Sequence, residues 1–156
     1  MPDAIEVGDP APDFTLPSTE GDVSLSALLG CGDRVVLAFY VEDGTPSCQT
    51  EVSLLKDSYE LLREFGASVV AASADSLKSH RAFAERLNGV PFPLASDQDL
   101  IAARAYGVVD EGDPRRSRRA AFVIDRDGRV LLALSPFQPS NLASAEAIFQ
   151  ALGMET

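Results

Sequence analysis

Side chains that bind metals or form covalent cross-links are scarce in this chain. It contains no tryptophan, a single histidine and two cysteines, Cys31 and Cys48. A zinc site built from protein ligands alone needs more histidine and cysteine than this, so we expect no metal site. Residues 1–6 have neither the basic nor the apolar region of a signal peptide. Two distant cysteines without an export signal indicate reduced thiols rather than a disulfide framework.

Positive charge and long apolar runs are scarce too. The 13 lysines and arginines stand against 24 aspartates and glutamates, which gives a formal net charge of -11. This excess of negative charge argues against binding to nucleic acid or to an anionic membrane surface. No apolar run approaches the length of a membrane span. We therefore expect a cytoplasmic protein with neither nucleic acid nor membrane among its partners.

The remaining pattern predicts an α/β fold. With 156 residues, 46% of them hydrophobic, one domain over residues 1–156 with one sizeable core is expected. Apolar and helical periodicities place strands at 35–40, 68–74, 92–94, 120–124 and 130–134, and helices at 46–65, 76–87, after Asp97 and at 140–152. A short hairpin is expected between 14 and 25. This order predicts a sandwich with a mixed central sheet, and segment 110–118 is expected to be a charged, mobile loop.

Cys48 stands at the junction between the strand at 35–40 and the helix that follows it. Thr45 is a good N-cap, and Pro46 suits the first helical position, so Cys48 falls in the first turn. Free backbone N–H groups and the positive end of the helix dipole favour a thiolate there. Cys48 is therefore a candidate nucleophile. The alternative that it is only a small buried hydrophobe stays open on this argument alone.

Several motifs, taken together in their order and spacing, carry a resemblance to a known family. They are Val-Gly-Asp-Pro-Ala-Pro-Asp-Phe at 7–14, Val-Leu-Ala-Phe-Tyr at 36–40, Thr-Pro-Ser-Cys-Gln-Thr-Glu at 45–51, Phe-Pro-Leu-Ala-Ser-Asp at 92–97, Tyr-Gly-Val at 106–108 and Arg-Ala-Ala-Phe-Val-Ile-Asp at 119–125. Nearly the whole chain thus resembles the peroxiredoxins, particularly their bacterioferritin-comigratory and one-cysteine alkyl hydroperoxide reductase-like branches.

The resemblance implies a fold, an activity and a set of partners. The fold would be a thioredoxin-like α/β sandwich, with a mixed central sheet flanked by helices and an N-terminal β-hairpin extension. The activity would be that of a thiol-dependent peroxidase that needs no cofactor and reduces hydrogen peroxide and organic hydroperoxides through a cysteine sulfenic acid. The partners would be the peroxide and an external thiol reductant: thioredoxin, a glutaredoxin-like protein or a low-molecular-weight thiol. The chain would be a monomer or a homodimer.

The family's active-site pattern is Pro-x-x-x-Thr-x-x-Cys with a distant arginine. Thr45, Cys48 and Arg119 match it, whereas Val41 stands where the proline belongs. Valine keeps the apolar bulk but not the fixed φ of proline. The resemblance assigns peroxide binding to Thr45 and thiolate stabilisation to Arg119, and it gives Glu51 the role of orienting the arginine. From the residues alone, Glu51 is a favourable acid in the first helical turn, and Arg119 is one of several arginines in a basic loop.

Other interpretations remain beside the peroxidase. Thiol–disulfide exchange is disfavoured, because Thr45 occupies the first position of the Cys-x-x-Cys motif that it needs. A redox-sensing or binding module with weak peroxidase activity stays open.

Cys31 lies in a glycine-flanked segment, and Ser53 stands where some relatives carry a second reactive cysteine, so a one-cysteine cycle is expected. His80 is expected to be an exposed helix residue, and Tyr40 to be part of the core or of a pocket wall.

Overall fold

A mixed sheet lies at the centre of the computed structural model, which describes residues 5–43, 45–110, 112–134 and 142–152. Its strands, in the spatial order β5-β4-β3-β6-β7, are β3 (Arg34–Phe39), β4 (Ala67–Ser73), β5 (Leu94–Ser96), β6 (Ala120–Ile124) and β7 (Val130–Leu134). Strands β3, β4 and β5 are parallel to one another, β6 is antiparallel to β3, and β7 is antiparallel to β6. A separate hairpin pairs β1 (Thr15–Leu16) with β2 (Val23–Ser24). The predicted mixed sheet with an N-terminal hairpin is confirmed.

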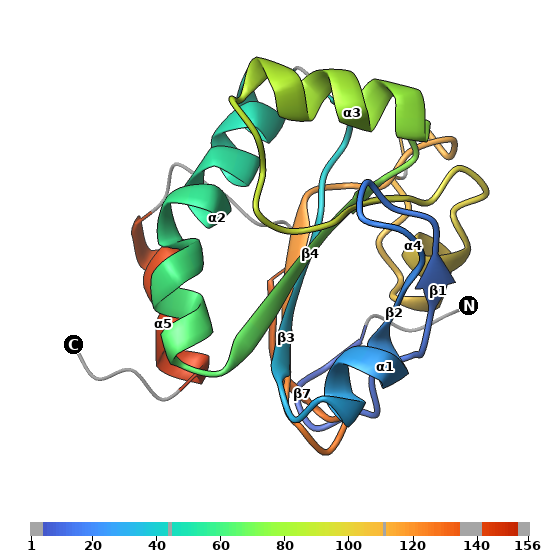
Figure 1. Ribbon diagram of the computed structural model, residues 1–156. Coiled ribbons are helices and arrows are strands. Elements are labelled where there is room, and N and C mark those ends of the chain that lie inside the picture. The colour runs from blue at the N-terminus through green and yellow to red at the C-terminus, as the bar shows by residue number, and fades with distance from the viewer. Residues whose placement is uncertain (1–4, 44, 111, 135–141, 153–156) are drawn as a thin grey trace.

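Helices and the hairpin cover the two faces of the sheet, as Figure 1 shows. On one face lie α2 (Pro46–Glu64) and α5 (Leu142–Ala151), together with α3 (Leu77–Arg86), whose Phe83 joins the same core. The other face is covered by the hairpin, α1 (Leu25–Gly30) and α4 (Ile101–Ala105). No helix within the described ranges is long and apolar enough to cross a membrane.

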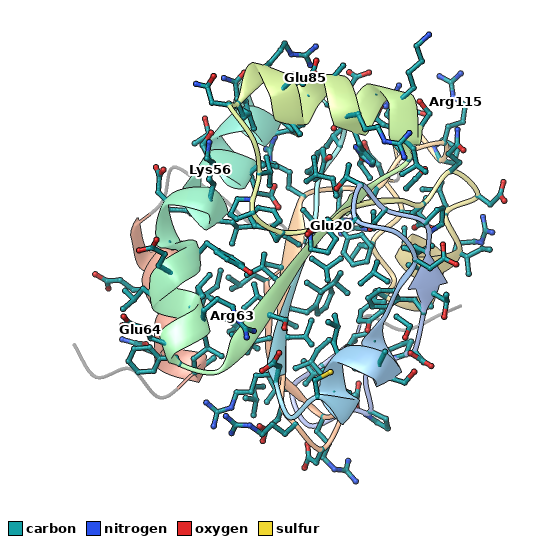
Figure 2. The ribbon with its side chains drawn as sticks, viewed as in Figure 1. Glu20, Lys56, Arg63, Glu64, Glu85 and Arg115 are labelled. Atoms are coloured by element: carbon teal, nitrogen blue, oxygen red, sulfur yellow. The ribbon has the colours of Figure 1, made fainter. Side chains whose placement is uncertain are left out.

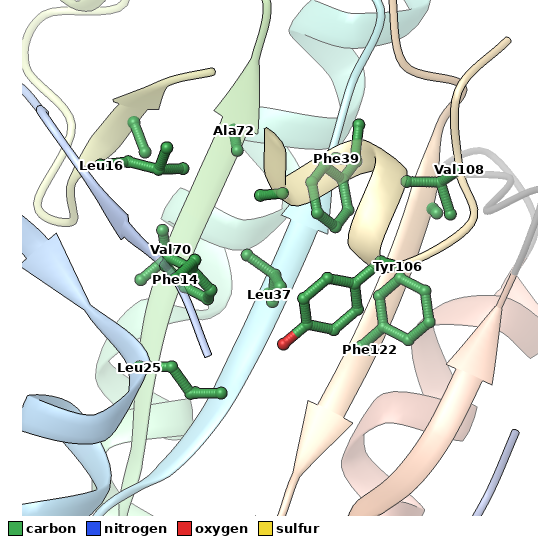
Figure 3. Packing of buried hydrophobic residues seen from close by; sticks show 14 of the residues in the cluster. Phe14, Leu16, Leu25, Leu37, Phe39, Val70, Ala72, Tyr106, Val108 and Phe122 are labelled. Carbon is green, nitrogen blue, oxygen red and sulfur yellow. The ribbon is translucent and has the colours of Figure 1, made fainter. Parts of the chain in front are cut away.

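The central strand β3 supplies both cores, because successive side chains of a strand point to opposite faces. Val35, Leu37 and Phe39 face the hairpin, and Val36 and Ala38 face α2. Figure 3 shows the first of these cores, where the Tyr106 ring packs on Phe39 and Phe122 with centroids 5.6 and 5.0 Å apart. Outside the cores, charged side chains such as Glu64, Glu85 and Arg115 point away from the molecule (Figure 2).

One sequence-based expectation for local structure is wrong. The third strand lies at Leu94–Ser96 rather than at 92–94, because its partners are Ala71–Ser73 of β4 and pairing sets the register. The described residues of the segment 110–118 form a loop, in which Ser117 is buried and forms a β-bridge with Val109. The predicted start of the last helix, at 140, lies outside the described residues.

Candidate active site

Cys48 lies in the first turn of α2, directly after the segment that leads out of β3. The helix begins at Pro46 with Thr45 as its N-cap residue, as the sequence predicts. The Cys48 side chain is buried, with 1% of its surface exposed. The backbone N–H of Val41 donates a hydrogen bond to the sulfur, at 3.3 Å. Two sources of positive potential thus reach the sulfur: the helix start and a peptide N–H from the preceding loop.

Thr45 holds the N-cap position without capping the helix through its side chain. Its hydroxyl instead donates to the carbonyl oxygen of Glu42, at 3.2 Å. A carbonyl oxygen can only accept, so the hydroxyl proton is engaged and the oxygen keeps lone pairs for another donor. A hydroxyl oriented in this way, three residues before Cys48, can accept a hydrogen bond from the O–H of a hydroperoxide.

Arg119 reaches the same end of the sheet from a distant part of the sequence. It immediately precedes Ala120, and Ala120 pairs with Phe39 at the end of β3. The antiparallel register therefore places Arg119 beside the segment that carries Cys48. Its Nε is buried, and no hydrogen-bond partner for this atom exists in the described part of the chain. Such a donor is available to a ligand oxygen.

Glu51 is buried one helical turn after Cys48, rather than exposed as an acid of the first turn. Both its carboxyl oxygens lack a hydrogen-bond partner among the described residues. Burial, and next the nearby Cys48, raise the pKa of Glu51 well above its ordinary value, and the charge of Arg119 opposes this only in part. Glu51, Cys48 and Arg119 therefore interact electrostatically, although no hydrogen bond joins Glu51 to Arg119 within the described part of the chain. We call these three residues the reactive cluster.

A second group of polar residues was missed by the sequence-based analysis. His80, expected to be exposed, is completely buried and lies next to Asp43 and Tyr40. Its Nε2 donates to the carbonyl oxygen of Ala95 at 2.9 Å, and its Nδ1 lies 2.9 Å from a carboxylate oxygen of Asp43. The Tyr40 hydroxyl and the Ser79 hydroxyl also donate to Asp43, at 2.6 and 2.8 Å. We call Tyr40, Asp43, Ser79 and His80 the anchoring cluster.

The anchoring cluster has further contacts that fix the loop between β3 and α2. The backbone N–H of Asp43 donates to Asp75 at 2.8 Å, and Arg116 forms an ion pair with Glu42 at 3.0 Å. Ligand-type atoms of Asp43, Asp75 and His80 lie within 4.8 Å of one another, as in a metal site. However, hydrogen bonds within the protein account for their arrangement. We therefore interpret the group as an anchor for the loop that carries Val41 and Thr45.

Comparison with known proteins decides the family of this chain. The model of the AhpC/TSA family matches residues 7–133. The chain belongs to this peroxiredoxin family. It is 38% identical over 139 residues to a putative peroxiredoxin bcp of Coxiella burnetii, covering 85% of this chain and 89% of that protein. It is 39% identical over 134 residues to chloroplastic peroxiredoxin Q of Sedum lineare, covering 85% of this chain and 70% of that protein.

A solved structure agrees with the family assignment. The crystal structure of peroxidoxin BcpB from Mycobacterium tuberculosis superimposes on this AhpC/TSA chain with a TM-score of 0.85 and 33% identity, covering 97% of this chain and 99% of that one. The resemblance to peroxiredoxins, the thioredoxin-like fold and the enzyme class, a thiol-dependent peroxidase, are thereby confirmed. The roles of individual residues are not tested by these comparisons and stay predictions.

Proposed function

We propose that the chain reduces hydrogen peroxide and organic hydroperoxides through Cys48, in a one-cysteine cycle completed by an external thiol. The observation that carries the proposal is the buried, unpartnered Arg119 Nε beside the end of β3, where Cys48 lies in the first turn of α2. A buried donor without a partner is costly, so its persistence indicates a ligand that accepts from it. Peroxide oxygens meet that requirement.

Each site residue has a defined part in the proposed reaction. Thr45 accepts a hydrogen bond from the O–H of the hydroperoxide while its own hydroxyl donates to the carbonyl oxygen of Glu42. The sulfur of Cys48 attacks the terminal oxygen, a sulfur–oxygen bond forms and the oxygen–oxygen bond breaks. The departing oxygen takes the electron pair and then a proton, which releases water or an alcohol and leaves a sulfenic acid. Arg119 stabilises the thiolate first and the departing oxygen second.

The positions of the two thiols support the one-cysteine cycle. Cys31 is exposed at the C-terminal end of α1, before β3, and Cys48 follows the other end of that strand. The strand separates them by roughly 20 Å at about 3.3 Å per residue. A disulfide requires Cα atoms within about 7 Å. The sulfenic acid therefore waits for an external thiol, and excess peroxide over-oxidises it. We also retain the prediction that the protein works in the cytoplasm, as a monomer or homodimer.

Peroxide consumption in the presence of dithiothreitol tests the assignment of Cys48. Activity should be abolished in Cys48→Ser and retained in Cys31→Ser, since only Cys48 lies at the helix start. Full activity in Cys48→Ser contradicts the proposal.

Arg119→Ala should slow oxidation by about a hundredfold, the size of effect that loss of one preorganised donor has in other enzymes. Arg119→Lys should recover only part of the rate, because lysine restores the charge but not the geometry of the guanidinium. An Arg119→Ala variant as fast as the parent removes Arg119 from the mechanism.

Intact mass spectrometry tests the one-cysteine cycle. One equivalent of peroxide should add the mass of one oxygen atom, and dimedone should trap the product as a sulfenic acid. A loss of two hydrogens, with Cys31 and Cys48 joined within one monomer, would show that the chain rearranges and that the cycle uses both cysteines.

A further inference from the structure

Val41 provides something that the proline of the family pattern cannot. Its backbone N–H donates a hydrogen bond to the Cys48 sulfur at 3.3 Å. Proline has no N–H, so a chain with proline at this position lacks the bond altogether. The departure from the family pattern therefore places an additional donor directly on the reacting atom. This donor belongs to the backbone, so any residue except proline at position 41 supplies it.

A buried hydroxyl on the far side of the same peptide group aims this N–H at the sulfur. The carbonyl of the Tyr40–Val41 peptide accepts a hydrogen bond from Ser117 Oγ at 2.8 Å. A trans peptide is planar, and its C=O and N–H point in opposite directions. Fixing the carbonyl on Ser117 thus fixes the N–H on Cys48. The Ser117 side chain is 1% exposed, so water does not compete for this carbonyl.

Arg116 secures the next peptide along the chain. Its Nη1 donates to the carbonyl oxygen of Val41 at 3.4 Å while its Nη2 pairs with Glu42. Both peptide groups flanking Val41 are therefore held by the segment that precedes β6. That segment also ends at Arg119, so one stretch of chain sets two donors of the site.

We propose that the Val41 N–H is a further catalytic donor to the Cys48 thiolate, and that Ser117 is the residue that positions it. The proposal rests on the proposed function, in which Cys48 attacks the peroxide. A hydrogen bond to an ionised sulfur is stronger than one to a neutral thiol, so the donor raises the thiolate fraction at a given pH. Ser117 strengthens it further by polarising the shared peptide.

The donor acts on the resting thiolate more than on the transition state. During attack the sulfur lone pair becomes the sulfur–oxygen bond, and the electron pair of the oxygen–oxygen bond leaves with the departing oxygen, which is protonated by water. Sulfur is thereby oxidised by two electrons and loses its negative charge, so the Val41 bond weakens. The donor thus increases the amount of thiolate and moderately lowers the reactivity of each thiolate.

Val41→Pro tests this, because it installs the family residue and deletes the N–H. The thiolate absorbance of Cys48 is titrated in a Cys31→Ser background. The midpoint of this titration should lie about one pH unit higher in Val41→Pro than in the parent. At a pH below the midpoints of both proteins, this shift corresponds to an about tenfold smaller thiolate fraction. Peroxide reduction should slow at neutral pH, yet at a pH above both midpoints it should equal or exceed the parent rate. General damage to the site would lower the rate at every pH. Val41→Ala keeps the N–H and loses the bulk, so its midpoint should match the parent.

Ser117 is tested in the same assay. Ser117→Ala should move the midpoint upward by less than Val41→Pro does, and Ser117→Thr should restore it, because threonine keeps the hydroxyl. A midpoint in Ser117→Ala equal to that of the parent removes Ser117 from the proposal.

If Val41→Pro does not fold, the Val41 N–H can be removed in another way. Valine at position 41 is replaced by its hydroxy-acid analogue, which turns the Tyr40–Val41 peptide bond into an ester. It keeps the side chain and removes only the donor. A thiolate midpoint equal to that of the parent overturns the proposal, whereas an upward shift supports it. Failure of the proposed function would look different, since peroxidase activity would then survive in Cys48→Ser.

Discussion

The reactive cluster and the anchoring cluster both contact the segment between β3 and α2, and they differ in how their hydrogen bonds are satisfied. In the described part of the chain, buried side-chain nitrogen and oxygen atoms without a partner occur at Glu51 and Arg119, both in the reactive cluster. In the anchoring cluster the Asp43 carboxylate accepts from Tyr40 and Ser79 and contacts His80. The two clusters are similarly buried, but polar atoms of the reactive cluster lack hydrogen-bond partners whereas those of the anchoring cluster have them.

If the proposed function is correct, this difference separates the residues that hold the loop in place from those that take part in the reaction. A buried polar group without a partner costs free energy, whereas a saturated one holds its neighbours in place. The charges differ accordingly. Burial tends to raise the pKa of Asp43, but hydrogen bonds from His80 and Tyr40 outweigh it and hold the pKa below its ordinary value. Burial, and next the charge of Cys48, raise the pKa of Glu51, and among the described residues no hydrogen bond to its carboxyl oxygens offsets this.

Breaking the anchoring cluster should have the largest effect on stability. Asp43→Ala removes the acceptor of the buried Tyr40 hydroxyl and of the half-buried Ser79 hydroxyl, and the partner of the buried His80, so the free energy of unfolding should fall by about 3–5 kcal/mol at neutral pH. Asp43 contributes its stability above its unfolded pKa of about 3.9, and this is lost as pH falls through the lower folded pKa. The difference in free energy of unfolding between parent and variant should therefore become smaller in acid. Urea unfolding at a series of pH values measures this difference.

The matched control is Asp113→Ala. Asp113 also pairs with a cation, Arg115, at 3.1 Å, but this pair lies at the surface, with 87% of the Arg115 side chain exposed. Water replaces such a pair readily, so stability should change little. If Asp43→Ala costs no more than Asp113→Ala, the saturated cluster is not an anchor.

Neutralising Glu51 should change stability less and in the opposite direction. Above about pH 4.3 the unfolded chain ionises Glu51 while the folded chain keeps it protonated, so the parent loses stability as pH rises. Glutamine does not titrate, so the stability of Glu51→Gln relative to the parent should increase progressively toward neutral pH. Thermal unfolding from pH 4 to neutrality checks this, with Glu64→Gln, an exposed acid of the same helix, as control. Parallel profiles for the two variants would contradict the raised pKa of Glu51.

The smallest effect is expected at Cys31, which belongs to neither cluster. Its side chain is exposed at the end of α1, so Cys31→Ser should change the free energy of unfolding by less than about 0.5 kcal/mol. Urea unfolding under reducing conditions measures this. A loss above about 1 kcal/mol would mean that Cys31 has a packing role that its exposure does not reveal.

Local signals in the sequence were sufficient for most of the fold. Thr45 and Pro46 mark the start of α2, and Gly66, with φ +74°, follows its end. The sequence predicts a helix after Asp97, and α4 begins at Ile101. Asp97 accepts from the N–H groups of Ala102 and Ala103 although it lies outside the helix, because Leu100 adopts a left-handed conformation in between.

The anchoring cluster could not be found by the same means. Its members come from a loop and from a helix more than 30 residues later, and the hydrogen bonds between them have no period in the sequence. One signal was available for His80: it stands three residues before Phe83, so both share the inward face of α3. A polar residue in an apolar stripe indicates a buried partner, but the sequence does not identify Asp43 as that partner.

The unequal exposure of the two thiols has a practical consequence for anyone who wishes to build a peroxide sensor from this chain. Cys31 is exposed, while the Cys48 side chain is buried among apolar residues. A bulky maleimide dye or electrode linker should therefore attach at Cys31 alone, at the end of β3 away from Cys48. The chain thus offers one thiol for attachment, and labelling it leaves Cys48 unmodified.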